Sequence, residues 1–311
     1  MLSVSIKRAS ALRKGDRVRL VAPASPFDRR LFERGVKAVR QMGYEPVYDR
    51  AEFRQAGFLA GSDEERARRL GRALMDPEAA AVWFIRGGYG SARLLPRLKW
   101  KLLRRYPKVL IGFSDTTALL VSLTVPEGYV TIHGPVVTQL PRLPVGPKRW
   151  LAKLVGRPEP AGRVPLGGMK TVVPGKINGF LTGGNLATLA SMVGTPYFPE
   201  LAGSILFIED TGEEAYRLDR MFNQLLQAGV LKNVFGVVIG TLAGCKPPGR
   251  VKYGARKTLE RAVAELGVPA VSGASFGHAE RNVALPLGVL ARLDASSGAL
   301  TLLEPAVTHS L

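Results

Sequence analysis

Three residues of the chain have the types and positions typical of a hydrolase active site. Ser114, Glu209 and His278 each follow a short apolar run, and each run predicts a β-strand. The order serine, acid, histidine fits the nucleophile, the orienting acid and the general base of a hydrolase triad. The sequence therefore predicts that these three side chains come together and that Ser114 attacks an acyl group.

Ser114 lies where a strand is expected to turn into a helix. Residues 108–113 end in an apolar run, and residues 116–123 have a helical pattern. A hydroxyl at such a turn points out of the carboxyl edge of the sheet, and the helix N-terminus beneath it favours negative charge. Serine is also an ordinary helix cap, so Ser114 alone favours the cap. The positions of Glu209 and His278 turn the balance toward a triad.

Other residues offer alternatives for the same chemistry. His278 stands in a polar loop, which suits a general base but also a solvated histidine. His133 lies in an apolar segment, where a hydrogen-bonded core histidine is expected, and His309 lies in a tail. Cys245, the single cysteine, could be a nucleophile, although a lone cysteine is more often inert packing. Three histidines without an H-E-x-x-H motif give little support to a zinc hydrolase.

Two glycine-rich segments precede predicted helices, and the first of them also follows a predicted strand. Residues 86–93 lack the third glycine of a dinucleotide fingerprint. Gly87 and Gly88 would instead let backbone N–H groups approach a reacting atom, as an oxyanion hole requires, and a tight turn is the competing interpretation. Residues 182–186 either line a pocket or begin a helix with Asn185 as its cap.

The chain is strongly basic, with 44 Lys and Arg against 25 Asp and Glu and a formal charge of +19. This charge suggests nucleic-acid binding, but the basic residues are scattered, as at 66–69 and 99–105, without a recognisable nucleic-acid module. A solvated basic surface with no dedicated nucleic-acid site is the stronger interpretation. We expect no membrane span and no signal peptide, and the single cysteine suits a reducing cytoplasm.

The order of the elements predicts an α/β fold. Strands are expected at 17–23, 46–48, 79–85 and 109–111, with helices at 28–42 and 63–75. This alternation predicts a mostly parallel sheet with helices on both faces. We expect an N-terminal α/β domain at 1–140, a Pro- and Gly-rich linker at 141–175, and a C-terminal α+β domain at 176–311. The last should hold a helix near 213–228, begun by a capping box of Thr211 and Glu214, and a hairpin of 289–293 with 299–303.

Several segments resemble the LD-carboxypeptidases, in the same order over nearly the whole chain. They are residues 59–63, 87–90, 112–115, 178–186, 206–210, 276–278 with Asn282, and 285–288. The resemblance implies a serine peptidase with two domains. The N-terminal domain, similar to class I glutamine amidotransferases, would carry the nucleophile, and the C-terminal domain would carry the acid and the base.

By this resemblance Ser114 is the nucleophile, His278 the general base and Glu209 the acid that orients it. The backbone N–H groups of Gly88 and Asp115 would form the oxyanion hole, in a cleft between the domains. The implied reaction releases the terminal D-alanine of a murein tetrapeptide in cytoplasmic cell-wall recycling, with no metal or organic cofactor. The expected partners are the murein peptide and a second copy of the chain in a homodimer.

Two other functions stand as alternatives. A microcin-immunity-type peptidase would cleave an acyl link to a modified nucleotide. An aromatic side chain in a longer inter-domain loop would favour it, and Trp150 is the candidate. A non-enzymatic nucleic-acid-binding protein would use the positive charge, bind DNA in a salt-sensitive way and lack peptidase activity.

Overall fold

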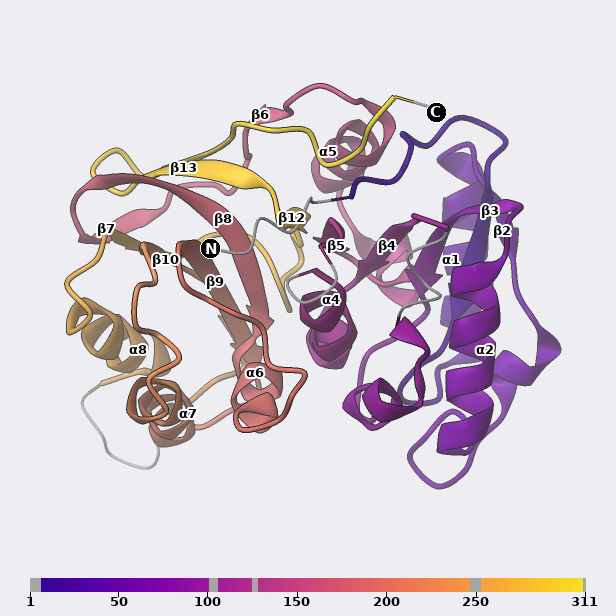
Figure 1. The fold of residues 1–311 in the computed structure, drawn as a ribbon, viewed down its shortest axis with the longest axis horizontal. Helices are drawn as coiled ribbons and strands as arrows, with labels where there is room; N and C mark the ends of the chain where they lie inside the picture. Colours follow the sequence, from indigo (N-terminus) through magenta and orange to yellow (C-terminus); the bar gives the residue numbers. More distant parts are fainter. Residues whose placement is uncertain (1–6, 101–105, 125–127, 247–252, 310–311) are drawn as a thin grey trace.

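The computed structural model describes residues 7–100, 106–124, 128–246 and 253–309. Its strands form two β-sheets that lie side by side, the N-terminal sheet on the right of Figure 1 and the C-terminal sheet on the left. Helices pack against both sheets, so the chain has a mixed α/β fold.

The N-terminal sheet has six strands in the order β12-β5-β4-β3-β1-β2. Five of them pair in parallel, and β12 joins the edge antiparallel to β5, so the predicted mostly parallel sheet is confirmed. The strands are β1 (Arg17–Val21), β2 (Glu45–Val47), β3 (Ala79–Phe84), β4 (Val109–Gly112), β5 (Thr131–His133) and β12 (Leu285–Leu287). Because parallel strands end at one edge, the residues that follow β3 and β4 lie close together.

Helices α1 (Arg29–Gln41) and α2 (Asp63–Met75) begin where the sequence predicts. Asp28 accepts a hydrogen bond from the Leu31 N–H at 2.7 Å, and Ser62 and Glu65 form a capping box at the start of α2. Helix α4 (Thr117–Thr124) is buried along its whole length and packs against β5 on one side and β8 on the other. Within the described ranges, no helix has the length and apolar character needed to cross a membrane.

The C-terminal sheet has eight strands in the order β6-β14-β13-β8-β9-β10-β11-β7. They are β6 (Gly162–Arg163), β7 (Lys170–Val173), β8 (Lys176–Asn185), β9 (Ser204–Thr211), β10 (Gly236–Ala243), β11 (Ala270–Ser272), β13 (Leu290–Asp294) and β14 (Ala299–Leu302). Strands β8 to β11 are parallel and alternate with helices α6 (Leu186–Met192), α7 (Ala215–Gln227) and α8 (Ala255–Ala264).

The expected α+β arrangement is therefore wrong at the centre of this sheet, which is α/β with antiparallel strands on both sides. Helices α6 and α8 have only 7 and 10 residues, too short to stand out as crossover helices in the sequence. Helix α7 and the β13–β14 hairpin are confirmed. The predicted capping box is wrong, because Thr211 ends β9 and its hydroxyl donates to the Ala243 carbonyl.

Residues 141–175, expected as a linker, contain helix α5 (Val145–Gly156) together with β6 and β7. The side chain of Trp150 on α5 is buried, and its indole N–H donates to the Ala284 carbonyl at 2.8 Å. Trp150 thus anchors α5 to the segment before β12 and presents no aromatic face at the surface.

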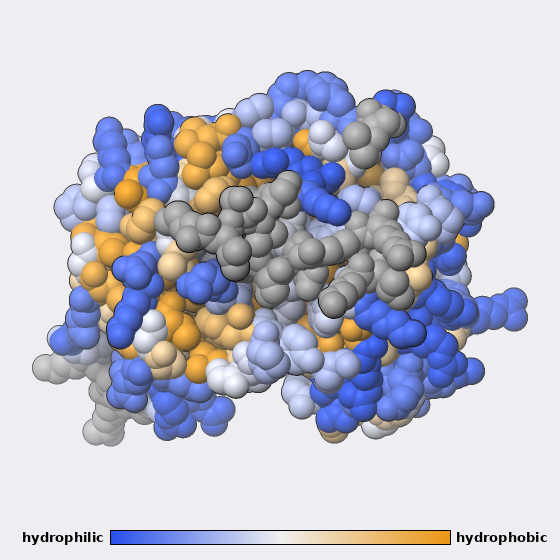
Figure 2. Space-filling view, viewed as in Figure 1, coloured by the Kyte–Doolittle hydropathy of each residue, from blue (hydrophilic) through white to orange (hydrophobic). Residues whose placement is uncertain are grey.

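The basic run at 66–69 is mostly enclosed by protein. Arg66 and Arg69 are buried and form ion pairs with Asp63 and Glu52. Only Arg68 of this run is exposed. Residues 101–105 of the second run lie outside the described residues. Figure 2 shows hydrophilic residues over both halves of the molecule, with hydrophobic residues gathered on the left, over the C-terminal sheet.

Glycines at the end of β8 allow this strand to lie close to its neighbours. Gly184 has a φ of 146°, and a Cβ there would lie 2.5 Å from Thr117 Oγ1 on α4. The next residue, Asn185, donates its backbone N–H to the same hydroxyl at 3.1 Å. Since β12 also crosses into the N-terminal sheet, the two sheets are tied together by the chain itself and by these contacts.

Replacing Gly183 by alanine should destabilise the junction of β8 and β9. The φ of Gly183 is 133°, and a Cβ there would lie 1.9 Å from the carbonyl oxygen of Phe207, a backbone atom within the sheet. Gly194 has a φ of 83° but open space around it, so Gly194→Ala controls for backbone strain alone. We expect Gly183→Ala to lower the free energy of unfolding in urea by about 2 kcal/mol more than the control does. Equal losses for both variants would contradict this account.

Candidate active site

Ser114 sits on a strained turn at the carboxyl end of β4. A 3₁₀ turn, η3 (Ser114–Thr116), connects the strand to α4. The φ of Ser114 is 65°, a value that a non-glycine residue adopts only at a cost, and in the described chain only Asn233 resembles it. Such a turn lifts the serine Oγ out of the sheet edge, as the nucleophile of a strand-to-helix elbow requires.

The three residues predicted from the sequence form one hydrogen-bonded chain. His278 Nε2 lies 3.0 Å from Ser114 Oγ, and His278 Nδ1 lies 2.7 Å from Glu209 Oε2. The backbone N–H of His278 donates to the same carboxylate oxygen at 3.1 Å. Ser114 follows β4, Glu209 belongs to β9, and His278 lies in the loop after β11, so the chain of bonds crosses from one sheet to the other.

Burial and pairing together set the charges in this chain. Burial raises the pKa of the Glu209 carboxyl, but the hydrogen bonds and the charge of His278 outweigh it and hold the pKa below its usual range. Burial lowers the pKa of His278, but the hydrogen bond and the charge of Glu209 outweigh it and raise the pKa above its ordinary value of 6.5. A neutral His278 whose Nδ1–H faces Glu209 leaves Nε2 able to accept the Ser114 proton.

The glycine-rich loop after β3 lies directly against the nucleophile. A Cβ on Gly87 would lie 2.9 Å from Ser114 Cβ, so only glycine lets this backbone come so close. Gly88 has a φ of 104° and packs against Ser25, whose Oγ accepts the Tyr89 N–H at 3.1 Å. Among the described contacts, none uses the Gly88 N–H. The Gly88 N–H is therefore a backbone donor one residue away from the contact between Gly87 and Ser114.

Two charged side chains hold this loop in place. The Asp115 carboxylate accepts the N–H groups of Gly90 and Ser91 at 3.1 and 2.8 Å. The buried guanidinium of Arg66 donates to the Gly90 carbonyl at 2.8 Å and also to the Pro23 carbonyl. The sequence predicted only a backbone role for Asp115 and a surface position for Arg66. One pattern in the sequence could have revealed that Arg66 is buried. Arg66 lies four residues before an apolar residue, which places both on the same face of the helix.

Asn282 and Gln139 shape the loop that carries His278. Asn282 Oδ1 accepts the Gly277 N–H at 2.9 Å, and its Nδ2 donates to Gln139 Oε1 at 3.0 Å. Gln139 Nε2 in turn donates to the Ala279 carbonyl at 3.2 Å. Gln139 follows β5 of the N-terminal sheet, so the part of the chain that carries the nucleophile also holds the histidine loop.

Asp210, the acid beside Glu209, serves a different purpose. It accepts hydrogen bonds from Asn185 Nδ2 at 3.1 Å and from the Ala187 N–H at 2.9 Å, at the start of α6. Burial raises its pKa to about 6. Asn185 also accepts the Thr188 N–H at 3.0 Å. The second glycine-rich segment is therefore a helix start capped by Asn185, the simpler of its two interpretations.

The alternative residues lie outside the hydrogen-bonded chain. Cys245 follows β10, and burial raises the pKa of its thiol, which disfavours the reactive thiolate. His309 is exposed at the end of the described chain, and His133 is fully buried at the end of β5. Within the described ranges, no three His, Cys, Asp or Glu side chains are grouped to hold a metal ion.

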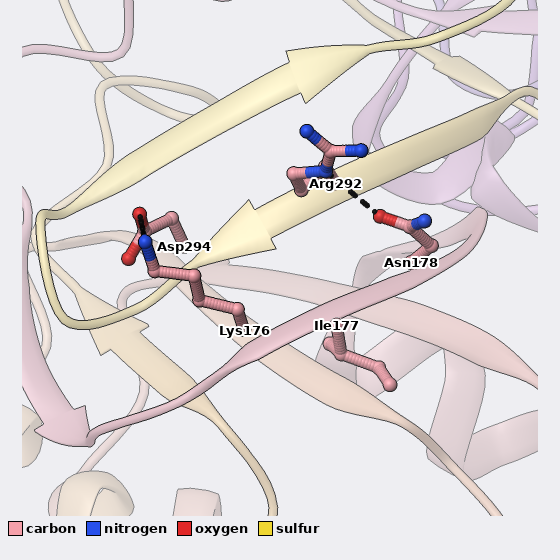
Figure 3. Close-up of a pocket in the computed structure, with 5 residues that line it drawn as sticks. All are labelled: Lys176, Ile177, Asn178, Arg292 and Asp294. Atoms are coloured by element: carbon pink, nitrogen blue, oxygen red, sulfur yellow. Dashed lines mark hydrogen bonds and ion pairs between the residues drawn. The ribbon is translucent and has the colours of Figure 1, made fainter.

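A separate surface pocket lies on strands β8 and β13 (Figure 3). There Lys176 pairs with Asp294 at 2.9 Å, and Arg292 donates to Asn178 at 3.1 Å. Lys176 begins β8, whereas Glu209 pairs with the last residue of that strand. This pocket therefore lies at the other end of β8 from the hydrogen-bonded chain, and its Lys176 and Asp294 already pair with each other.

Two family models match the chain. The LD-carboxypeptidase N-terminal domain matches residues 18–134, and the LD-carboxypeptidase C-terminal domain matches residues 178–293. The murein tetrapeptide carboxypeptidase of Pseudomonas aeruginosa is 34% identical over 290 residues, which cover 89% of this chain and 93% of that protein.

Solved structures have the same fold. The muramoyltetrapeptide carboxypeptidase from Oxalobacter formigenes superposes with a TM-score of 0.82 at 30% identity, covering 94% of this chain and 100% of that chain. The microcin C7 self-immunity protein MccF, in its wild-type apo state, superposes with a TM-score of 0.88 at 24% identity, covering 97% of this chain and 100% of that chain. At this lower identity, the second likeness establishes the fold alone.

The pKa of His278, measured by NMR of the ring protons from about pH 5 to 9, should lie above 6.5. In Glu209→Gln the pKa should fall below 6.5, because the amide cannot stabilise the imidazolium by charge while burial continues to oppose it. Glu213→Gln, which removes a carboxylate outside the hydrogen-bonded chain, is the control and should leave the titration unchanged. A His278 pKa that is the same in Glu209→Gln would contradict the pairing.

Proposed function

The chain belongs to the LD-carboxypeptidase family, and we propose that it hydrolyses the LD-peptide bond that joins the terminal D-alanine to a murein tetrapeptide. The family supplies the class of reaction, a serine-type peptidase acting at a free peptide end. The name of the Pseudomonas aeruginosa relative supplies the substrate, a murein tetrapeptide.

One observation carries the proposed mechanism: Ser114, held at a φ of 65°, is the first member of a hydrogen-bonded chain through His278 to the buried Glu209. His278 Nε2 would accept the hydroxyl proton as Ser114 Oγ attacks the carbonyl carbon before the D-alanine. Glu209 would stabilise the imidazolium that forms. His278 would then give the proton to the departing D-alanine nitrogen, leaving the shortened peptide as an ester on Ser114.

The second half of the reaction repeats these roles with water. His278 would take a proton from a water molecule as it attacks the ester, and would return it to Ser114 Oγ as the tripeptide leaves. In both halves we propose that the backbone N–H groups of Gly88 and Asp115 stabilise the oxyanion. The close packing of Gly87 on Ser114 and the clamping of the loop by Asp115 support this role.

The described residues weaken the case for the microcin-immunity reaction. Trp150, the aromatic residue that was the candidate for favouring this alternative, is buried and bonded to Ala284. The likeness to the MccF structure, at 24% identity, supports the fold and not the reaction. Nucleic-acid binding also loses support in the described chain, because Arg66 and Arg69 of the basic run are buried and paired.

Other expectations stay predictions. They are the division into domains at 1–140, 141–175 and 176–311, the likeness of the first to class I glutamine amidotransferases, the homodimer, and a place in cytoplasmic cell-wall recycling.

Ser114→Ala and His278→Ala should each lower kcat on a tetrapeptide ending in D-alanine by roughly 10⁴-fold or more, with little change in folding. The double variant should be little worse than either single one, because the two residues act in one step. Mass spectrometry of the released D-alanine and tripeptide measures the reaction, and Cys245→Ala is the control that should keep wild-type turnover.

Substrate choice is tested with the same assay. Tetrapeptide should be cleaved, while tripeptide, which lacks the terminal D-alanine, and an aminoacyl-nucleotide analogue should not. Cleavage of the analogue alone would overturn the proposed substrate, and full turnover by Ser114→Ala would overturn the serine mechanism.

A further inference from the structure

His133 is the polar centre of an aromatic cluster behind the hydrogen-bonded chain. Its ring is fully buried, with the ring of Phe207 at 5.3 Å and those of Phe113 and Phe276 at 5.9 Å between centroids. Each of these phenylalanines stands one or two residues before Ser114, Glu209 or His278. The cluster therefore touches the backbone that positions all three residues of the proposed triad.

A donor and an acceptor in this region lack partners. Among the described residues, the two ring nitrogens of His133 have no hydrogen-bond partner, and Glu209 Oε1 has none either. Glu209 Oε2, in contrast, accepts two bonds from His278. The other buried side-chain atoms without a partner in the described chain belong to Arg69 and Thr182. Because an unpaired buried polar group costs about 1–3 kcal/mol, a donor and an acceptor in the same apolar surroundings favour one another.

The strand geometry places His133 against the face of β9 that carries Glu209. Side chains alternate along β9, so Phe207 and Glu209 lie on the same face of the strand. The His133 ring contacts Phe207 on that face. Burial lowers the pKa of His133 to about 4, with the charge of Glu209 opposing this and that of His278 adding to it. At neutral pH the ring is therefore uncharged and carries one N–H donor.

We propose that His133 is a positioning residue of the triad, whose neutral ring donates a hydrogen bond through one bridging water to Glu209 Oε1. This inference rests on the proposed function. The bridge would fix the rotation of the carboxylate that orients His278. It would also draw negative charge from the carboxylate, which weakens the stabilisation of the imidazolium and keeps His278 available as a neutral base.

The effect on His278 passes through Glu209. The charged groups that act on His133 are Glu209 of β9 and His278 of the neighbouring loop, and those that act on His278 are Glu209 and Asp210. Removing the donor at His133 should therefore strengthen the attraction between Glu209 and the imidazolium and raise the pKa of His278. The acid limb of kcat/KM reports that pKa in the free enzyme.

The first test compares pH profiles of kcat/KM for the full chain on the tetrapeptide. His133→Phe keeps an aromatic ring in the cluster but has no donor. It should move the acid limb to higher pH by about half a unit. It should also lower kcat by a larger factor than it changes KM. His133→Gln or His133→Asn, whose amides replace one or the other ring nitrogen, should restore the limb. Thr182→Val removes a buried hydroxyl that also lacks a partner in the described chain, and should leave the profile unchanged. A limb in His133→Phe that superimposes on the wild type, or a shift in Thr182→Val alone, overturns the proposal.

The second test needs no activity and remains valid if His133→Phe fails to fold. In ¹⁵N-histidine-labelled protein, the ring of His133 should stay neutral across about pH 5 to 9, with an N–H proton that is protected from exchange and moves upfield in Glu209→Gln. A His133 ring signal that is unchanged in Glu209→Gln overturns the bridge. Failure of the wild-type chain to cleave tetrapeptide would count against the proposed function instead, and the NMR result would still decide whether His133 and Glu209 are joined.

Discussion

The chemistry depends on one hydrogen bond between two sheets, from Ser114 to His278 across 3.0 Å. Such a bond contributes only about 1 kcal/mol to stability, so it cannot hold the sheets in place. The two halves of the molecule must instead be fixed by packing that is complete without it. Shifts of about 1 Å in the position of a catalytic group can cost two orders of magnitude in rate, so this packing is part of the site.

Several contacts of different kinds supply that packing. Helix α4 begins three residues after Ser114 and packs against both β5 and β8. The chain returns from the C-terminal sheet to place β12 at the edge of the N-terminal one, beside the strand that carries His133. Asn282 and Gln139 then join the histidine loop to the N-terminal half. Because contacts between the two halves of the molecule hold both the nucleophile and the base, their relative position is a property of the whole fold.

Local patterns in the sequence predicted those parts of the structure that depend on neighbours along the chain. Helices α1 and α2 were predicted by their alternation with the apolar runs, and Ser114, Glu209 and His278 stood out because each follows an apolar run. Features that depend on distant contacts were missed. The short β12 pairs only because β5 presents an open edge, and Arg66 is buried only because carbonyl groups from two loops surround its guanidinium. The surroundings of His133 were missed as well, because no pattern reveals that its neighbours in space are three phenylalanines.

Glu209 shows how the site maintains a charge that its surroundings disfavour. A carboxylate with no exposed surface would normally take up a proton, because burial penalises the charged form. Here two bonds from His278 help to keep the pKa of Glu209 low, and the one from the ring also raises the pKa of His278, so each residue sets the charge of the other. One of these bonds comes from the backbone of the histidine, which means that the carboxylate is stabilised only when the loop after β11 has its native shape. Correct folding of that loop and the ionisation of Glu209 are therefore one event, and the orientation of the base follows from both.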